Sequence, residues 1–155
     1  MRWVLGIVVV LALLVTALFT LPLYKEPPVD MTWAVEGSDD IAEGAVTVRF
    51  TGTSTLLFSD GATNIMIDGW FSRPSAFALG FGEIEPDLEA ITYGLEANNV
   101  STLDVVIPVH SHYDHAMDSP EVAKRTGAVL LGSESTANIG RGWGLPEDQI
   151  NVFEH

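Results

Sequence analysis

The chain has 155 residues, which suggests one domain; 47% of them are hydrophobic and none is cysteine. Seven Lys and Arg residues against 21 Asp and Glu residues give a net charge of −14. Such an acidic surface repels nucleic acid and argues against a nucleic-acid partner, and the missing cysteines exclude disulfides and thiolate metal ligands.

An uncharged apolar run, residues 3–23, follows Arg2 at the N-terminus. As a helix rising about 1.5 Å per residue, it is just long enough to span the roughly 30 Å of bilayer hydrocarbon. We therefore expect residues 1–23 to be a transmembrane anchor that attaches the protein to a membrane. The positive end favours a cytoplasmic N-terminus, which places the domain outside the cytoplasm, in the periplasm or the extracellular space. A cleaved signal sequence, with cleavage near Ala17 and secretion of the protein, is the alternative.

Residues 24–43 contain Pro27 and Pro28 and few apolar side chains, which is typical of a linker. The domain then covers residues 44–155. Its hydrophobic pattern alternates between strands and helices, which predicts an α/β fold. The expected strands are residues 45–50, 54–58, 64–67, 105–109, 128–131 and 150–153, and the expected helices are residues 86–98 and 121–125.

Local signals mark the ends of several of these elements. Asp60-Gly61 predicts a hairpin turn between the second and third strands. Asp118 and Glu121 have the spacing of a capping box at the start of the second helix, and Gly127 is placed to end it. Residues 133–144 begin polar and helix-like and become glycine-rich.

Metal-ligand side chains follow the expected buried strand at residues 105–109. His110, His112, Asp114 and His115 lie within six residues and include three of the four histidines of the chain. Histidines two apart on an extended segment point to the same side, so His110 and His112 can bind one ion together. A bend beyond them could direct Asp114 and His115 at a second ion. Imidazole and carboxylate are ligands of zinc and similar divalent metals, so the pattern predicts a metal site.

The segment H-S-H-Y-D-H at residues 110–115 resembles the H-x-H-x-D-H signature of the metallo-β-lactamase superfamily. The likeness extends over residues 44–153 and covers only the front part of such a domain. The resemblance implies the αββα sandwich of that superfamily, here incomplete (its front half) and preceded by the transmembrane helix. It also implies a zinc-dependent hydrolase with two ions, which uses a metal-bound hydroxide on a small-molecule ester, lactone or phosphodiester.

The same resemblance implies a role for each motif residue. His110 and His112 would bind the first ion, and Asp114 and His115 the second. Asp114 would also act in catalysis by orienting the water or moving its proton. Asp68, which ends the third strand, would lie near the metal and orient a ligand; the alternative is a carboxylate that only begins a turn.

Residues 70–82 are rich in aromatic side chains and, by the resemblance, border the active site. These side chains either line a pocket for an apolar substrate or pack onto the core. The four aromatic residues are Trp70, Phe71, Phe77 and Phe81.

Members of the superfamily supply further ligands downstream, whereas the only later histidine here is His155. We therefore expect a hydrolase of which this chain is a truncated piece, inactive on its own. The alternative is a non-catalytic metal-binding remnant. The DNA after codon 155 would discriminate between them, because an open frame with another strand-end histidine supports the enzyme and an immediate stop supports the remnant.

Overall fold

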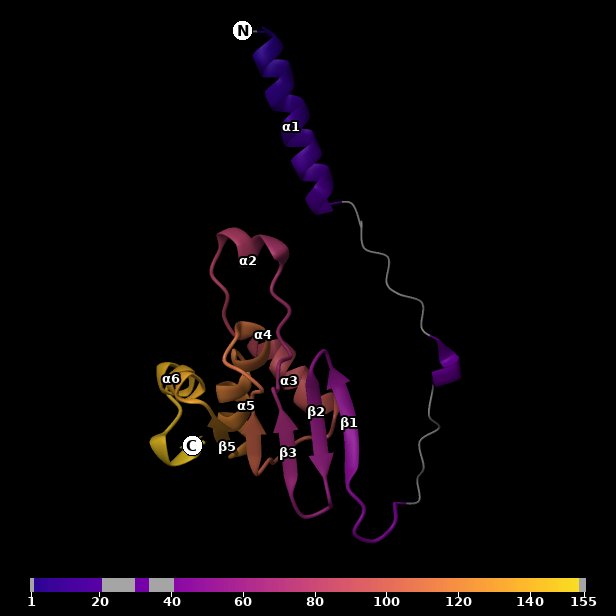
Figure 1. Ribbon diagram of the computed structural model, residues 1–155, viewed down its shortest axis with the longest axis vertical. Coiled ribbons are helices and arrows are strands. Elements are labelled where there is room, and N and C mark those ends of the chain that lie inside the picture. The colour runs from indigo at the N-terminus through magenta and orange to yellow at the C-terminus, as the bar shows by residue number, and fades with distance from the viewer. Residues whose placement is uncertain (1, 21–29, 34–40, 154–155) are drawn as a thin grey trace. The chain divides into compact units, whose positions relative to one another are not determined.

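The computed structural model describes residues 2–20, 30–33 and 41–153, and the chain divides into two units (Figure 1). The first unit, Met1–Asp39, contains helix α1 (Arg2–Thr20) and the short 3-10 helix η1 (Met31–Trp33). Most of the predicted linker, residues 24–43, lies outside the described residues.

The structure contradicts the prediction of a transmembrane anchor at residues 1–23. Across the described ranges, no helix is both long enough and apolar enough to cross a membrane. α1 covers 19 residues and includes the charged Arg2. The prediction of a membrane anchor is therefore wrong. The predicted location outside the cytoplasm was inferred from that anchor and is withdrawn.

The second unit, Asp40–His155, is built on a mixed six-stranded sheet with the strand order β1-β2-β3-β4-β5-β6. Neighbouring strands are antiparallel from β1 to β3 and parallel from β3 to β6. All six expected strands are present, with ends within two residues of the prediction. The strands are β1 (Thr47–Gly52), β2 (Thr55–Ser59), β3 (Asn64–Ile67), β4 (Val105–Ile107), β5 (Val129–Gly132) and β6 (Ile150–Val152).

Helices connect the parallel strands, and three of them cover one face of the sheet. Met66, Val106 and Leu130 lie side by side on β3, β4 and β5 and are completely or almost completely buried. Ile91 and Val122, which lie on two of these helices, pack against them in the same core. The helices are α2 (Ala76–Phe81), α3 (Leu88–Ala97), α4 (Tyr113–Ala116), α5 (Ser119–Thr126), α6 (Glu134–Trp143) and the 3-10 helix η2 (Glu147–Gln149).

The opposite face of the sheet is also apolar but is poorly covered by the described residues. The strand register aligns Phe50, Leu56, Ile67 and Ile107 in one row across this face. Phe50 is 65% exposed and the other three are only partly buried. The described residues thus form a mixed α/β fold with a six-stranded sheet and one helical layer.

Two helices begin at other residues than predicted. In each case an aspartate near the start of the helix accepts hydrogen bonds from backbone amides other than those expected. The helix expected at residues 86–98 begins at Leu88, since Asp87 caps it by accepting hydrogen bonds from the amides of Glu89 and Ala90, both at 3.0 Å. The capping box predicted for α5 is wrong. Asp118 makes no capping hydrogen bond and instead accepts from the amides of Phe71 and Ser72.

Candidate metal centre

The motif lies where the chain leaves β4. Pro108 has no amide hydrogen to extend the strand ladder, and β4 ends at Ile107. The chain then bends into the single-turn helix α4, in which the carbonyl of His112 accepts hydrogen bonds from the amides of His115 and Ala116 at 3.1 and 2.8 Å. This turn folds the second half of the motif back beside the first half.

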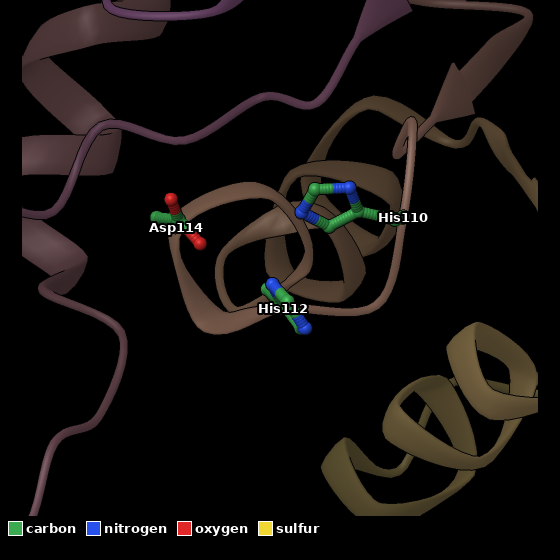
Figure 2. Close-up of side chains that lie close together, drawn as sticks. All are labelled: His110, His112 and Asp114. Atoms are coloured by element: carbon green, nitrogen blue, oxygen red, sulfur yellow. The ribbon is translucent and has the colours of Figure 1, made fainter.

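Three motif side chains gather around one space (Figure 2). His110, His112 and Asp114 each offer a ligand atom, and these atoms lie within 4.8 Å of one another. The two imidazole rings are 4.5 Å apart, as expected for histidines directed to one side. Asp114 was expected with His115 alone, but its carboxylate lies near both groups, with Oδ2 3.8 Å from Nε2 of His115. One carboxylate therefore connects the two expected ligand pairs.

His115 is oriented by a buried carboxylate. Its Nδ1 lies 2.8 Å from Oδ2 of Asp68, which is fully buried, while the His115 side chain itself is 17% exposed. A proton on Nδ1 that is donated to Asp68 leaves a lone pair on Nε2, the nitrogen on the Asp114 side. This arrangement is the one that metal-binding histidines commonly adopt, because the carboxylate fixes both the tautomer and the ring orientation.

Asp68 is itself held on several sides. Its Oδ1 accepts a hydrogen bond from the amide of Val109 at 2.8 Å, which ties the end of β3 to the start of the motif. Its carbonyl accepts from the hydroxyl of Ser119, at the start of α5. Asp68 adopts a positive φ of 62°, which Asp tolerates better than most residues. It therefore does more than begin a turn, which was the alternative to its expected place beside a ligand.

A second buried carboxylate, Asp118, was not expected near this site. It accepts hydrogen bonds from the amides of Phe71 and Ser72 at 2.8 and 2.6 Å and from the Ser72 hydroxyl at 2.7 Å. Burial raises the pKa of Asp118, although these hydrogen bonds and the charge of Arg73 oppose the shift. Asp118 thereby fixes the loop after β3 against the motif. The sequence predicted Asp118 only as part of a capping box, and its position three residues after His115 is the one signal that could have placed it near this site.

The comparison with known families decides what kind of domain this is. Residues 48–152 match the model of the metallo-β-lactamase superfamily. The chain belongs to this superfamily. The match includes the whole H-x-H-x-D-H motif and confirms the resemblance on which the predicted fold was based.

Relatives within the superfamily are similar over the same region. A UPF0173 metal-dependent hydrolase of Thermus thermophilus is 34% identical over 85 residues, which are 55% of this chain and 30% of that protein. A UPF0173 metal-dependent hydrolase of Anaeromyxobacter is 30% identical over 112 residues, 72% of this chain and 35% of that protein. The chain thus spans about a third of the length of the relatives it matches.

Among solved structures, a metallo hydrolase from Ignicoccus hospitalis is similar to this chain. It has a TM-score of 0.48 and 24% identity, over 70% of this chain and 40% of that one.

The metallo-β-lactamase superfamily implies a divalent metal, and the described residues fit one. The donors are the exposed imidazoles of His110 and His112 and the half-exposed carboxylate of Asp114. A third imidazole, that of His115, offers Nε2, since its Nδ1 is already hydrogen-bonded to Asp68. Such oxygen and nitrogen donors suit zinc and similar ions. His155, the other histidine considered as a ligand, lies outside the described residues.

The aromatic loop beside this centre divides between the two expected roles. Phe71 is buried in the core, whereas Phe77 and Phe81 are exposed on α2 and contact each other at 5.6 Å. Trp70 is half-buried and packs edge-on against Tyr113 of the motif at 6.2 Å. Only Trp70 therefore contributes an aromatic surface next to the motif.

Proposed function

We propose that this chain carries the metal-binding part of a zinc-dependent hydrolase that acts on a small-molecule ester, lactone or phosphodiester. The observation that carries the proposal is the convergence of His110, His112 and Asp114, with His115 held by Asp68 at its edge. The names of the similar UPF0173 proteins, metal-dependent hydrolases, support the reaction class.

In this proposal His110 and His112 hold one zinc ion, and Asp114 and His115 hold a second. The close approach of the His110 and His112 rings supports the first pair. The 3.8 Å separation between Asp114 and Nε2 of His115 supports the second pair, because both groups can contribute to one ion after a small movement. Asp68 keeps the Nε2 lone pair of His115 available by accepting the Nδ1 proton.

Zinc, when bound, lowers the pKa of water towards neutrality and polarises the attacked carbonyl or phosphoryl group. Asp114 is the residue we propose as catalytic, because its carboxylate is 41% exposed and can accept a hydrogen bond from the attacking water or take its proton. The exposed rings of His110 and His112 leave the same space open to a substrate.

We also propose that the 155 residues alone bind zinc weakly and do not catalyse hydrolysis. The motif supplies two ligands to each ion, whereas catalytic zinc usually has three protein ligands and a water molecule. The missing donors would have to come from solvent or from residues outside the described ranges.

The test compares this chain with a version extended through the downstream reading frame. Both are supplied with zinc and assayed with a neutral ester, a lactone and a phosphodiester that release a coloured product. We expect hydrolysis only by the extended chain and its loss on His110→Ala. Tight zinc binding without turnover in either form would contradict the hydrolase and favour a non-catalytic metal-binding remnant.

A further inference from the structure

Arg73 is connected to the motif indirectly, through two neighbours that each lie next to it. Its guanidinium stacks over the ring of Trp70 at 4.5 Å, and Trp70 packs against Tyr113 of the motif. Its Nη2 lies next to Gly52, 3.5 Å from where a side-chain Cβ would be placed there. The turn after Gly52 carries Ser54, whose hydroxyl is 3.5 Å from Nδ1 of His115. Both contacts therefore bring the guanidinium to the edge of the motif.

No carboxylate of the described residues forms an ion pair with Arg73. Nη1 donates to the carbonyls of Trp70 and Ser72 at 3.1 and 2.7 Å, and the ion pairs formed by arginines in this part of the chain involve Arg125 and Arg141. The nearby Asp118 already accepts three hydrogen bonds from Phe71 and Ser72. Arg49 also forms no ion pair among the described residues, but its Nη1 donates to the carbonyl of Asn98, whereas Arg73 lies in the loop that follows β3.

The guanidinium is also held in place before any ligand binds. The carbonyls of Trp70 and Ser72 and the Trp70 ring fix the guanidinium from one side. Asp118 fixes the backbone just before Arg73 by accepting a hydrogen bond from the amide of Ser72. The N–H groups of Nε and Nη2 have no acceptor among the described residues, and a guanidinium presents such groups as a planar fork that matches a carboxylate or phosphate. Pre-organisation of this kind reduces the entropy lost on binding.

One neighbouring region disfavours an anion. Arg73 lines a cavity of about 480 Å³ whose other walls include Glu83, Glu85 and Asp87. Because these carboxylates repel negative charge, the side of the guanidinium towards Gly52 is more favourable for an anion than the cavity side.

We propose that Arg73 binds an anionic group of the substrate, a phosphate or a carboxylate, next to the hydrolysed bond. This inference rests on the proposed hydrolase function and restricts its substrates to esters that carry a negative charge. The rest of the surface is acidic and would repel such a substrate. The positive charge of Arg73 would therefore attract the anionic group to this one place.

The test measures the binding of inorganic phosphate to the metal-free protein by calorimetric titration at low salt. We expect saturable binding that Arg73→Gln weakens at least about tenfold, because a charge-assisted bidentate contact is lost. Arg73→Lys should weaken it less, since the charge remains without the fork. Lys124→Gln, which removes the same charge from an exposed position on α5, should leave the affinity within about twofold. Thermal melts of each variant verify folding.

The absence of saturable binding, or an equal loss in Arg73→Gln and Lys124→Gln, would overturn the proposal. A parallel titration with benzoate distinguishes a carboxylate from a phosphate, and dependence on Arg73 for either anion supports the site. Because the measurement needs neither metal nor turnover, its failure is separate from a failure of the hydrolase proposal, which would appear only in the zinc-loaded assay.

Discussion

The Asp68 carboxylate and the His115 imidazole meet at 2.8 Å although they are 47 residues apart in the chain. Asp68 directly follows β3 and His115 lies in α4, so their contact fixes the motif to the sheet. The same carboxylate accepts the amide of Val109, directly before the motif. The position and tautomer of His115 therefore depend on how the chain leaves a neighbouring strand.

Asp68→Asn should reverse the His115 tautomer and weaken metal binding. An amide N–H directed at Nδ1 would require Nδ1 to accept, which places the proton on Nε2, where the metal needs a lone pair. Asn tolerates the positive φ of this position, so the backbone should be retained. We expect the affinity for the second ion, which His115 helps to hold, to fall about 10- to 100-fold. Nitrogen chemical shifts of His115 and titration with Co²⁺ measure both effects.

Asp104→Asn is the matched control for this substitution. Asp104, which precedes β4, accepts a hydrogen bond from the amide of Asn64 and forms no hydrogen bond or ion pair with the motif in the described part of the chain. Equal loss of Co²⁺ affinity in the two variants would show that Asp68 has no special role at His115.

Gly94→Ala should destabilise the domain through the loop beside the centre. A Cβ at Gly94 in α3 would overlap the ring of Phe71, including Cε1 at 2.6 Å. Overpacking of this kind costs about 1–3 kcal/mol of unfolding free energy. Gly142→Ala in α6 is the control, because nothing lies within 4 Å of its added Cβ, and helix propensity should stabilise it by about 0.5–1 kcal/mol. Chemical denaturation that gives the same sign for both would contradict the packing of Phe71.

Glu121→Gln should destabilise the domain at neutral pH and much less in acid. Burial raises the pKa of Glu121, but hydrogen bonds from Arg125 and Trp143 and the charges of Arg125 and Lys124 outweigh it, so the pKa lies below its usual 4.5. A lowered folded-state pKa means that the stabilisation is present above the unfolded-state pKa and is lost as the pH falls through the folded-state pKa.

We expect a difference of about 1–2 kcal/mol between Glu121→Gln and the unmodified protein at neutral pH, falling towards zero below pH 4.5. Glu134→Gln removes an exposed partner of Arg141 and should change stability by less than about 1 kcal/mol. Urea titrations over the pH range measure both variants. A Glu121→Gln effect that grows on acidification would have the wrong sign.

Phe50→Lys should reduce self-association of the 155-residue protein. Phe50 lies on the apolar sheet face that the described helices do not bury, and a lysine on an edge strand opposes strand pairing. Phe77→Lys on α2 is the control, since Phe77 is similarly exposed, at 68%, but lies off the sheet. Sedimentation velocity should show a larger monomer fraction for Phe50→Lys only. An equal response of both variants would remove the sheet face as the cause.

Hydrophobic periodicity was sufficient to predict the strands, although β1 and β6 contain no buried residue and only the inner strands have a strongly buried face. The Met66, Val106 and Leu130 row produces an apolar signal in β3, β4 and β5, and turn residues such as Asp60-Gly61 bound the strands. Helix α2 has no buried residue, so burial left no periodic pattern to identify it. The N-terminal run was assigned to a membrane from its apolar composition, which the described helix α1 does not support.

The site was predictable as a ligand cluster but not as a network. Sequence spacing indicated that His110 and His112 face one side, whereas the position of Asp114 between both pairs depends on the turn of α4. The contact between Asp118 and Ser72 joins residues 46 positions apart. No local pattern predicts such a contact, and the capping-box spacing of Asp118 suggested a different partner.

Metal binding by the motif is tested most directly by titrating the 155-residue protein with Co²⁺ and following its visible absorption. We expect a weakly bound, low-symmetry Co²⁺ spectrum, and His110→Ala and His112→Ala should each remove the contribution of the first ion. His115→Ala should reduce the amount of bound Co²⁺ without abolishing binding, because it removes a ligand of the second ion only. Unchanged Co²⁺ binding in all three variants would contradict the assignment of the metal to this motif.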